Sequence, residues 1–268
     1  SEAINSNLIL SKIIKDSLIE CNISTDLVQI IKITERSAVS ELLKMDEYID
    51  VIIPRGGKGL IKKISKESKI PLIKHLDGNC HVYVDKDADF TTAINCTLNS
   101  KTQRYGVCNA AESLVFHQDF PKSCIKKILQ ELHKHEVEIR GCRKTKTIFN
   151  KAHLAKESDW YEEYLRPVIS VKIVKNIDDA IEHIEKYGSH HTDTIITKNK
   201  SAQTKFLKTV NSSSVMVNTS TRFADGYEYG LGAEIGISTD KIHARGPVGL
   251  EGLTNLKYIV NSKGVIKN

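Results

Sequence analysis

The feature that most constrains the fold is an alternation of short apolar runs with segments of helical periodicity. Apolar runs of strand length occupy residues 168–174, 193–197 and 214–218, and residues 177–187 and 202–210 between them have helical spacing. Neighbouring parallel strands need a long crossover, which is usually a helix. The alternation therefore predicts an α/β fold built on a doubly wound parallel sheet.

The rest of the chain follows a similar rhythm. The further elements that the apolar pattern predicts are helices at 4–18, 38–45, 60–68 and 122–135 and strands at 27–33, 50–53, 70–73, 80–84, 113–117 and 256–260. Helices and strands alternate up to residue 84, which is typical of the later half of a dinucleotide-binding domain. Residues 226–252 hold many of the glycines and are expected to be rich in loops.

Composition excludes several classes of protein. Of the 268 residues, 40% are hydrophobic and 27% are charged, which is typical of a globular protein with a sizeable core. The formal net charge is +6, but the lysines are scattered without interleaved aromatic residues, so we expect no nucleic-acid partner. No apolar run reaches about 18 residues, so we expect no membrane span. The six cysteines form no CxxC pair and no zinc spacing, so we expect reduced thiols, no metal site and a cytoplasmic location.

Cys108 is the first candidate for chemistry. It follows a glycine turn within residues 103–110 and comes shortly before a predicted strand, a placement that can present a thiol to a cleft. The thiolate is the reactive form of cysteine, so an active site here should lower the pKa of Cys108. The alternative is a structural cysteine, because free cysteines are commonly buried.

A glycine-rich turn joins one predicted strand to the following helix and has the sequence Arg55-Gly56-Gly57-Lys58-Gly59. Glycines let the backbone approach a phosphate, and the N-terminus of a helix favours anions. The turn matches neither the GxGxxG nor the Walker pattern, so an ordinary strand-to-helix turn is the alternative.

Polar side chains gather in two loops of the C-terminal part of the chain. Asn218, Ser220 and Arg222 follow a predicted strand, and His243 and Arg245 lie in a later glycine-rich loop. Arginine can bind a carboxylate or a phosphate through two parallel hydrogen bonds. Each loop, taken alone, also fits an ordinary solvated surface.

Several blocks of the sequence, in order, resemble the γ-glutamyl phosphate reductases of the aldehyde dehydrogenase superfamily. The block KTQRYGVCNAAE at 101–112 is similar to the segment that carries the nucleophilic cysteine in that family. The other similar blocks lie at 49–57, 75–85, 159–165, 187–193, 217–226 and 230–247. The resemblance implies an aldehyde dehydrogenase-like α/β fold with an incomplete dinucleotide-binding parallel sheet and a second α/β catalytic domain.

The resemblance also implies a reaction. In this family NADPH reduces L-glutamyl 5-phosphate to L-glutamate 5-semialdehyde and releases phosphate, an oxidoreductase step of proline biosynthesis. Cys108 would attack the acyl phosphate to form a thioester, and the Cys108 backbone amide and the Asn109 side chain would stabilise the oxyanion. The residues expected to bind the substrate are Asn218, Ser220, Arg222, His243 and Arg245.

For the cofactor, the resemblance implies that Arg55, Gly56 and Gly57 lie along the pyrophosphate of NADP(H). Glu163 matches the glutamate that holds the nicotinamide ribose in the superfamily pattern Glu-x-Phe-Gly-Pro-Val, although a surface glutamate is the alternative. His75 stands where the superfamily motif Glu-Leu-Gly-Gly-Lys has the glutamate that activates water. A reductase must protect its thioester from hydrolysis, which fits this departure, although a packed histidine is the alternative.

The resemblance divides the chain into three parts. We expect residues 1–107 to be the C-terminal half of the NADP-binding domain, 108–226 the catalytic domain, and 227–268 a C-terminal return segment with an oligomerisation strand. The N-terminal part of the family precedes Ser1, which implies an N-terminally truncated member. The chain is then either an NADPH-dependent reductase, active alone or with a separate chain that supplies the missing part, or a non-catalytic remnant or oligomerising domain. By resemblance we expect a homo-oligomer.

Overall fold

The computed structural model describes residues 3–35, 37–242 and 244–267, and the chain divides into two compact units. The first unit comprises Ser1–Ile52 and Lys62–Leu72, and the second comprises Ile53–Ile61 and Ile73–Asn268. Among the described residues, no helix is long and apolar enough to cross a membrane.

The first unit is mainly helical. It contains α1 (Ile4–Glu20), the short 3-10 helix η1 (Thr25–Leu27), α2 (Ser37–Leu42) and most of α3 (Lys58–Glu67). The predicted first helix is confirmed, and it ends where Asn22 adopts a left-handed conformation with φ 54°. The N–H of Ile23 then bonds to the Leu18 carbonyl at 2.8 Å, a bond that satisfies an end carbonyl of the helix.

Three of the strands predicted for the N-terminal part do not form as ladders. The apolar run at 27–33 is irregular after η1, so that prediction is wrong. The runs at 50–53 and 70–73 meet in a single parallel bridge between Ile52 and Leu72. Apolar β-branched residues favour a strand, but a strand also needs a neighbouring strand to accept and donate its backbone hydrogen bonds.

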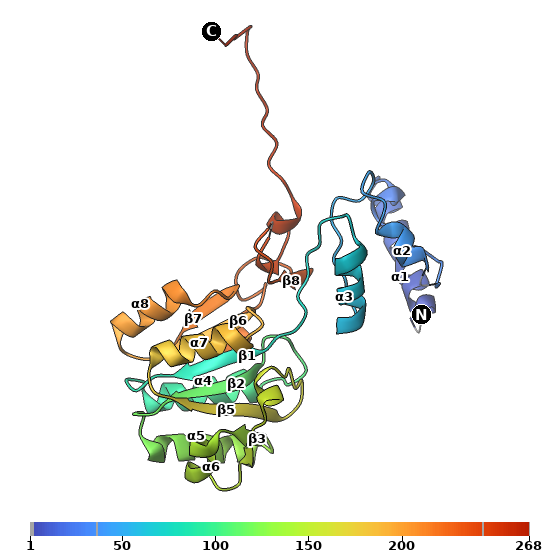
Figure 1. The fold of residues 1–268 in the computed structure, drawn as a ribbon. Helices are drawn as coiled ribbons and strands as arrows, with labels where there is room; N and C mark the ends of the chain where they lie inside the picture. The colour runs from blue at the N-terminus through green and yellow to red at the C-terminus, as the bar shows by residue number, and fades with distance from the viewer. Residues whose placement is uncertain (1–2, 36, 243, 268) are drawn as a thin grey trace. The chain divides into compact units, whose positions relative to one another are not determined.

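The second unit is built on a seven-stranded parallel sheet with the strand order β4-β3-β5-β2-β1-β6-β7 (Figure 1). The strands are β1 (Cys80–Val84), β2 (Ala111–His117), β3 (Glu138–Gly141), β4 (His153–Leu154), β5 (Val168–Val174), β6 (Thr192–Ile196) and β7 (Ser214–Val217). The predicted parallel α/β sheet is therefore confirmed. Its central strands are buried on both faces, as expected when helices cover a parallel sheet.

Helices cover both faces of this sheet (Figure 1). Val82 and Leu114 face a core shared with α4 (Phe90–Thr102), α5 (Lys122–Lys134) and α6 (Arg143–Ile148). Tyr83 and Val115, one residue further along their strands, face the other core, shared with α7 (Ile177–Tyr187) and α8 (Lys200–Thr209). The alternation of side chains along each strand thus supplies both faces with apolar residues.

α7 shows how the sequence encodes a covering helix. Asn176 caps it by accepting the N–H of Asp179 at 2.9 Å. Ala180, Ile181 and Ile184 follow at helical spacing and are buried against the sheet. The predicted helix at 177–187 is confirmed with these bounds.

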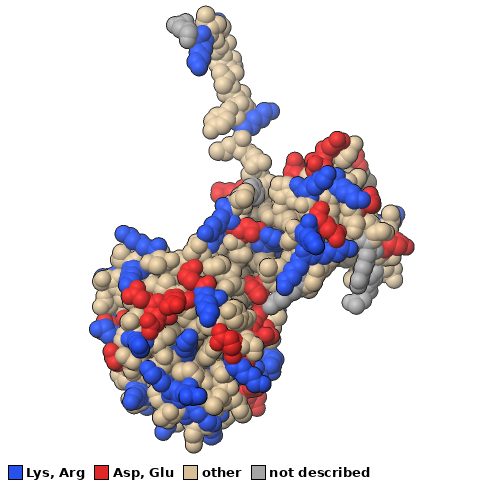
Figure 2. All heavy atoms as spheres, viewed as in Figure 1, with Lys and Arg blue, Asp and Glu red and all other residues tan. Residues whose placement is uncertain are grey.

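The C-terminal part is rich in loops, as predicted. It contains the 3-10 helices η3 (Thr221–Phe223) and η4 (Glu251–Leu253) and an antiparallel pair of short strands, β8 (Gly236–Ser238) and β9 (Gly246–Val248). The predicted strand at 256–260 does not form within this chain: these residues make no ladder, and their large apolar side chains are 82–93% exposed. The expected oligomerisation strand in this segment stays a prediction. In the view of Figure 2, basic and acidic side chains are interspersed over the visible face of the second unit.

The sheet crosses the domain boundary that the sequence predicted at residue 107. Strand β1 lies in the range assigned to the cofactor domain, yet it is hydrogen-bonded to β2 on one side and β6 on the other. The loop that carries Cys108 therefore lies between two adjacent strands of one sheet. The three-part division of the chain stays a prediction.

Candidate active site

The candidate site gathers at the amino ends of the central strands. Gly78 directly precedes the region of β1, Cys108 comes just before β2, Glu163 precedes β5 and His191 precedes β6. In most open α/β sheets the ligand lies at the carboxyl ends of the strands. This sheet brings its candidate catalytic groups to the opposite edge.

Backbone packing fixes the position of the Cys108 loop. The carbonyl oxygen of Cys108 accepts a hydrogen bond from the thiol of Cys80 at 3.2 Å. The Cα of Gly78 lies so close that an added Cβ would be 1.9 Å from the same oxygen. Only glycine fits at position 78 with the loop in this place.

The pKa of Cys108 differs from the expectation that the site would lower it. Burial of the thiol, followed by the charges of Glu234 and Glu163, raises the pKa of Cys108 to about 11. The N–H of Cys108 and the Arg222 guanidinium act in the opposite direction but do not compensate. The sequence signal, a glycine turn before a strand, could not show that two carboxylates would act on this thiol.

Asn109 is held by the loop that follows β7. Its side-chain amide donates to the carbonyls of Ala224 at 2.9 Å and Arg222 at 3.4 Å, and its side-chain oxygen accepts from Arg222. The hydroxyl of Thr221 donates to the backbone carbonyl of Asn109 at 2.7 Å. Both side-chain N–H groups are thus engaged, which favours the Cys108 amide as the oxyanion donor. This role stays a prediction.

Two of the five residues predicted to bind substrate line a cavity of about 350 Å³. They are Ser220 and Arg222, and the guanidinium of Arg222 is further held by the Gln103 side chain at 2.8 Å. Asp225 and Glu228 line the same cavity. It therefore offers one arginine and two carboxylates to a ligand.

The other predicted substrate residues lie differently. Asn218 bonds through its side chain to the backbone N–H and carbonyl of Thr197, at 2.8 and 3.0 Å. The guanidinium of Arg245 donates to the Asn211 carbonyl at 2.7 Å. His243 lies outside the described residues. The structure thus brings Ser220 and Arg222 together, whereas Asn218 and Arg245 bond to other loops.

Of the predicted cofactor residues, Glu163 lies beside the Cys108 loop. Its carboxylate accepts the N–H of Gly78 at 2.7 Å, and its charge acts on Cys108. Arg55 donates to the carbonyl of Ile235, and the loop continues through Gly56 at φ +150° to Gly57. A Cβ at Gly57 would meet nothing within 4 Å, so a phosphate could approach the backbone there.

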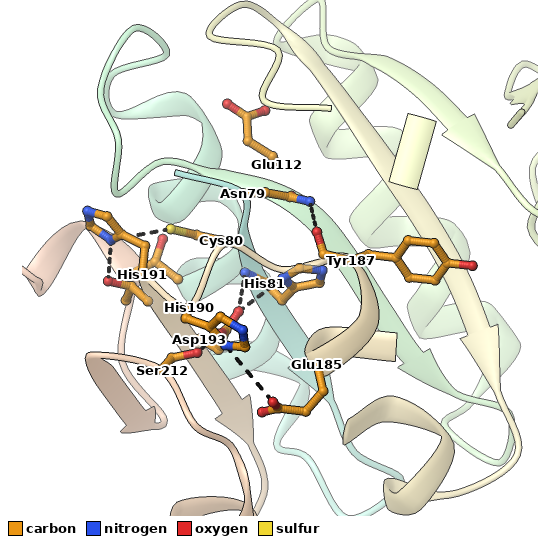
Figure 3. Close-up of polar contacts among 12 residues, drawn as sticks. Asn79, Cys80, His81, Glu112, Glu185, Tyr187, His190, His191, Asp193 and Ser212 are labelled. Carbon is orange, nitrogen blue, oxygen red and sulfur yellow. Dashed lines mark hydrogen bonds and ion pairs between the residues drawn. The ribbon is translucent and has the colours of Figure 1, made fainter. Parts of the chain in front are cut away.

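A buried polar network that the sequence analysis did not single out lies around Asp193 (Figure 3). The Nδ1–H of His81 donates to the Asp193 carboxylate at 3.0 Å, and the hydroxyl of Ser212 donates to the same carboxylate. The thiol of Cys80 lies 3.7 Å from Nδ1 of His191. These contacts tie β1 to β6 and to the segment before β7. In the sequence, this network was visible as polar residues within apolar strands.

His75, predicted to replace a water-activating glutamate, is half-buried. Its Nδ1 lies 3.2 Å from the Ile237 carbonyl, and its ring centre lies 5.8 Å from that of His191. Within the described parts of the chain, no group of three or more His, Cys, Asp or Glu side chains is arranged to hold a metal ion.

Comparison with known proteins identifies relatives of the chain. The model of the aldehyde dehydrogenase family matches residues 3–156. The chain is similar to a γ-glutamyl phosphate reductase from Thermotoga maritima, with 45% identity and a TM-score of 0.95 over 99% of this chain and 64% of that one. The chain thus spans less than two thirds of the length of that reductase.

Two less similar structures share the fold. A probable aldehyde dehydrogenase from Listeria monocytogenes has 18% identity and a TM-score of 0.72 over 99% of this chain and 67% of that one. A glyceraldehyde-3-phosphate dehydrogenase from Methanocaldococcus jannaschii, complexed with NADP, has 15% identity and a TM-score of 0.61 over 80% of this chain and 55% of that one.

Proposed function

The chain belongs to the aldehyde dehydrogenase family, and from this premise we propose that it reduces L-glutamyl 5-phosphate to L-glutamate 5-semialdehyde and phosphate, using NADPH, in proline biosynthesis. The proposal is carried by one observation. Cys108 lies in a loop fixed at the amino end of the sheet, and the next residue, Asn109, bonds to Arg222 of the cavity. The similarity to the Thermotoga maritima reductase supports the choice of substrate.

The first chemical step belongs to Cys108. Its thiolate attacks the acyl carbon, a carbon–sulfur bond forms, and the bond from carbon to the phosphate oxygen breaks, so that phosphate leaves with the bonding electrons. The thiol must first lose its proton. Glu234 is the carboxylate with the largest effect on Cys108, and burial raises the pKa of Glu234 as well, which makes it a better proton acceptor.

The residues present fit a nicotinamide cofactor. The reduced nicotinamide supplies a hydride to the thioester when the cofactor is bound. Glu163 has the carboxylate oxygens to accept hydrogen bonds from ribose hydroxyls, and Gly78 holds it beside the Cys108 loop. Gly57 leaves open space at the start of α3, where the backbone can accommodate a phosphate.

The cavity beside Asn109 suits an amino-acid substrate. Arg222 and Ser220 offer donors to a carboxylate or phosphate, and Asp225 and Glu228 offer acceptors to an α-ammonium group. His75, at the position of the water-activating glutamate, would preserve the thioester for reduction. Replacing His75 by Glu should increase the share of carboxylate product over aldehyde.

The experiment is to supply L-glutamyl 5-phosphate and NADPH and to measure aldehyde and phosphate release. Cys108→Ser should abolish both products. Cys124→Ser is the matched control, because Cys124 lies in α5, packed against the apolar core, and its replacement should leave the rate unchanged. An active Cys108→Ser variant would overturn the assignment.

A second candidate is a folded domain without catalytic activity. The observation that favours it is the raised pKa of Cys108, because a thiol whose pKa lies well above its ordinary value is almost entirely protonated at pH 7. A cysteine in that state is a weak nucleophile. Under either candidate function, we propose that the chain assembles with further copies of itself or with another chain.

A further inference from the structure

A buried ion pair brackets the Cys108 loop. Lys101 lies in the last turn of α4 and Glu112 lies in β2, so one precedes and the other follows the loop. The Nζ of Lys101 lies 2.5 Å from Oε2 of Glu112, and the two side chains are 0% exposed. The pair therefore closes the loop at its base.

Each charge of the pair depends on the other. A single buried ammonium or carboxylate is strongly disfavoured, because it loses the hydration that it has in water. A buried pair contributes little net stability compared with apolar residues of the same size, yet it constrains geometry, since each partner must stay beside the other. Lys101 and Glu112 thus fix the separation between the end of α4 and the start of β2.

Glu112 also reaches a second loop. Its other oxygen, Oε1, accepts the N–H of Leu165 at 3.1 Å. Leu165 has φ 52°, a left-handed conformation that is costly for a leucine and that this bond helps to hold. Leu165 lies two residues after Glu163. One carboxylate therefore joins the Cys108 loop to the turn that carries Glu163.

We propose that the Lys101–Glu112 pair acts as a clasp that aligns the Cys108 loop with the Glu163 turn, so that both are positioning residues for the reaction. The inference rests on the proposed function. The clasp holds Cys108 and Glu163 at a fixed position relative to each other. Neither clasp residue needs to touch the substrate for this role.

Burial and the ion pair have opposite effects on the pKa values of the two clasp residues. Burial raises the pKa of Glu112, and Glu163 raises it further, whereas Lys101 and the Leu165 N–H lower it. Burial lowers the pKa of Lys101, whereas the charge and the hydrogen bond of Glu112 raise it. Burial alone would move the two pKa values toward each other, and the ion pair opposes this, so each charge depends on its partner.

The test compares wild type with Lys101→Met, Glu112→Gln and the double variant of the full chain. The amide oxygen introduced by Glu112→Gln can still accept the Leu165 N–H, so the double variant removes the ion pair without leaving an unpaired charge. If the clasp positions the loop, amide exchange at 103–110 and iodoacetamide alkylation of Cys108 should each become about tenfold faster in the double variant. Exchange in β5 and alkylation of Cys124 should stay unchanged.

If the pair served only general stability, amide exchange in β5 would also become faster in the double variant, and that result would overturn the proposal. Unchanged exchange at 103–110 and unchanged Cys108 alkylation in a folded double variant would also overturn it. If the variants do not fold, native-state amide hydrogen exchange of the wild-type protein tests the proposal instead. The clasp predicts that the Leu165 amide opens together with the amides of 103–110, whereas separate opening contradicts it.

These readouts need no substrate, so they separate the clasp from the proposed reaction. In an active protein the double variant should lower kcat at nearly unchanged KM, because the clasp aligns groups without binding substrate. If wild type shows no reductase activity, the proposed function fails while the exchange result still decides the clasp.

Discussion

Replacing Gly78 by alanine is the most direct perturbation of the Cys108 loop. The new Cβ would lie 1.9 Å from the carbonyl oxygen of Cys108 and 2.6 Å from its carbonyl carbon. Real Cβ atoms essentially never come within 3.0 Å of such atoms, so the two segments must separate by at least 1.1 Å, the difference between 3.0 and 1.9. Both segments are backbone, and no flexible side chain can yield instead.

The displacement should reduce catalysis more than stability. A misplacement of about 1 Å at the reacting group can reduce the rate about 100-fold. Overpacking of this kind destabilises a fold by about 1–3 kcal/mol. The N–H of Gly78, which holds Glu163, moves with the same segment. We therefore expect kcat/KM of Gly78→Ala to fall about 100-fold in a protein that still folds.

The assay measures aldehyde formation together with urea unfolding, and Gly106→Ala is the matched control. Gly106 lies in the same loop as Cys108, but its added Cβ would meet nothing within 4 Å. Gly106→Ala should therefore stay close to wild type in both measurements. Wild-type kinetics in Gly78→Ala would refute the packing explanation.

Three further perturbations test other parts of the site. Glu163→Gln should weaken NADPH binding by about 10–150-fold in a calorimetric titration, because a charge-assisted hydrogen bond contributes about 1.5–3 kcal/mol. Arg222→Met should raise KM for L-glutamyl 5-phosphate by a similar factor and leave the Cys108 alkylation rate within about threefold. Burial lowers the pKa of His183 to about 2 and that of His191 to about 4, so both side chains stay neutral in the folded protein at pH 5 to 7. In the unfolded chain both histidines have the ordinary pKa of about 6.5 and take up protons below that pH. The free energy of unfolding should therefore fall by roughly 2–4 kcal/mol as the pH falls from 7 to 5. His183→Gln should weaken this pH dependence, as measured by urea unfolding.

The second α/β block could be predicted from sequence because its pattern is regular. Residues 168–174 and 177–187 read as strand and helix, and the structure forms β5 and α7 with those bounds. Helix α4 was missed, because the residues it buries are Ala93, Thr97, Ser100 and Lys101 rather than an apolar stripe. The side chain of Lys101 is buried because Glu112 lies opposite, and this partner could not be identified from helical spacing.

The false strands have a different cause. Residues 27–33 and 256–260 are apolar, but an apolar run does not specify which strand will pair with it. Their large side chains are exposed in part or almost fully, as with Leu27 at 71% and Tyr258 at 92%. Sequence reasoning recognised the composition of a strand, but no strand in the described part of this chain pairs with either run.

The site was predicted in part for similar reasons. Cys108 and Arg222 could be singled out from their motifs, and the structure joins them through Asn109. Gly78 and Cys80 lay within a recognised block, yet their contacts with the Cys108 carbonyl depend on the way two loops pack. The raised pKa of Cys108 likewise comes from its burial and then from Glu234 and Glu163, which are distant in sequence.

The central claim is that Cys108 forms a thioester, and mass spectrometry of the protein after mixing with L-glutamyl 5-phosphate, without NADPH, tests it most directly. We expect one acyl group per chain, mapped to Cys108 by peptide analysis, removed by NADPH and absent in Cys108→Ser. Acetyl phosphate provides a second acyl donor of the same chemistry. An unmodified Cys108, or an acyl group on another cysteine while Cys108 stays free, would contradict the account.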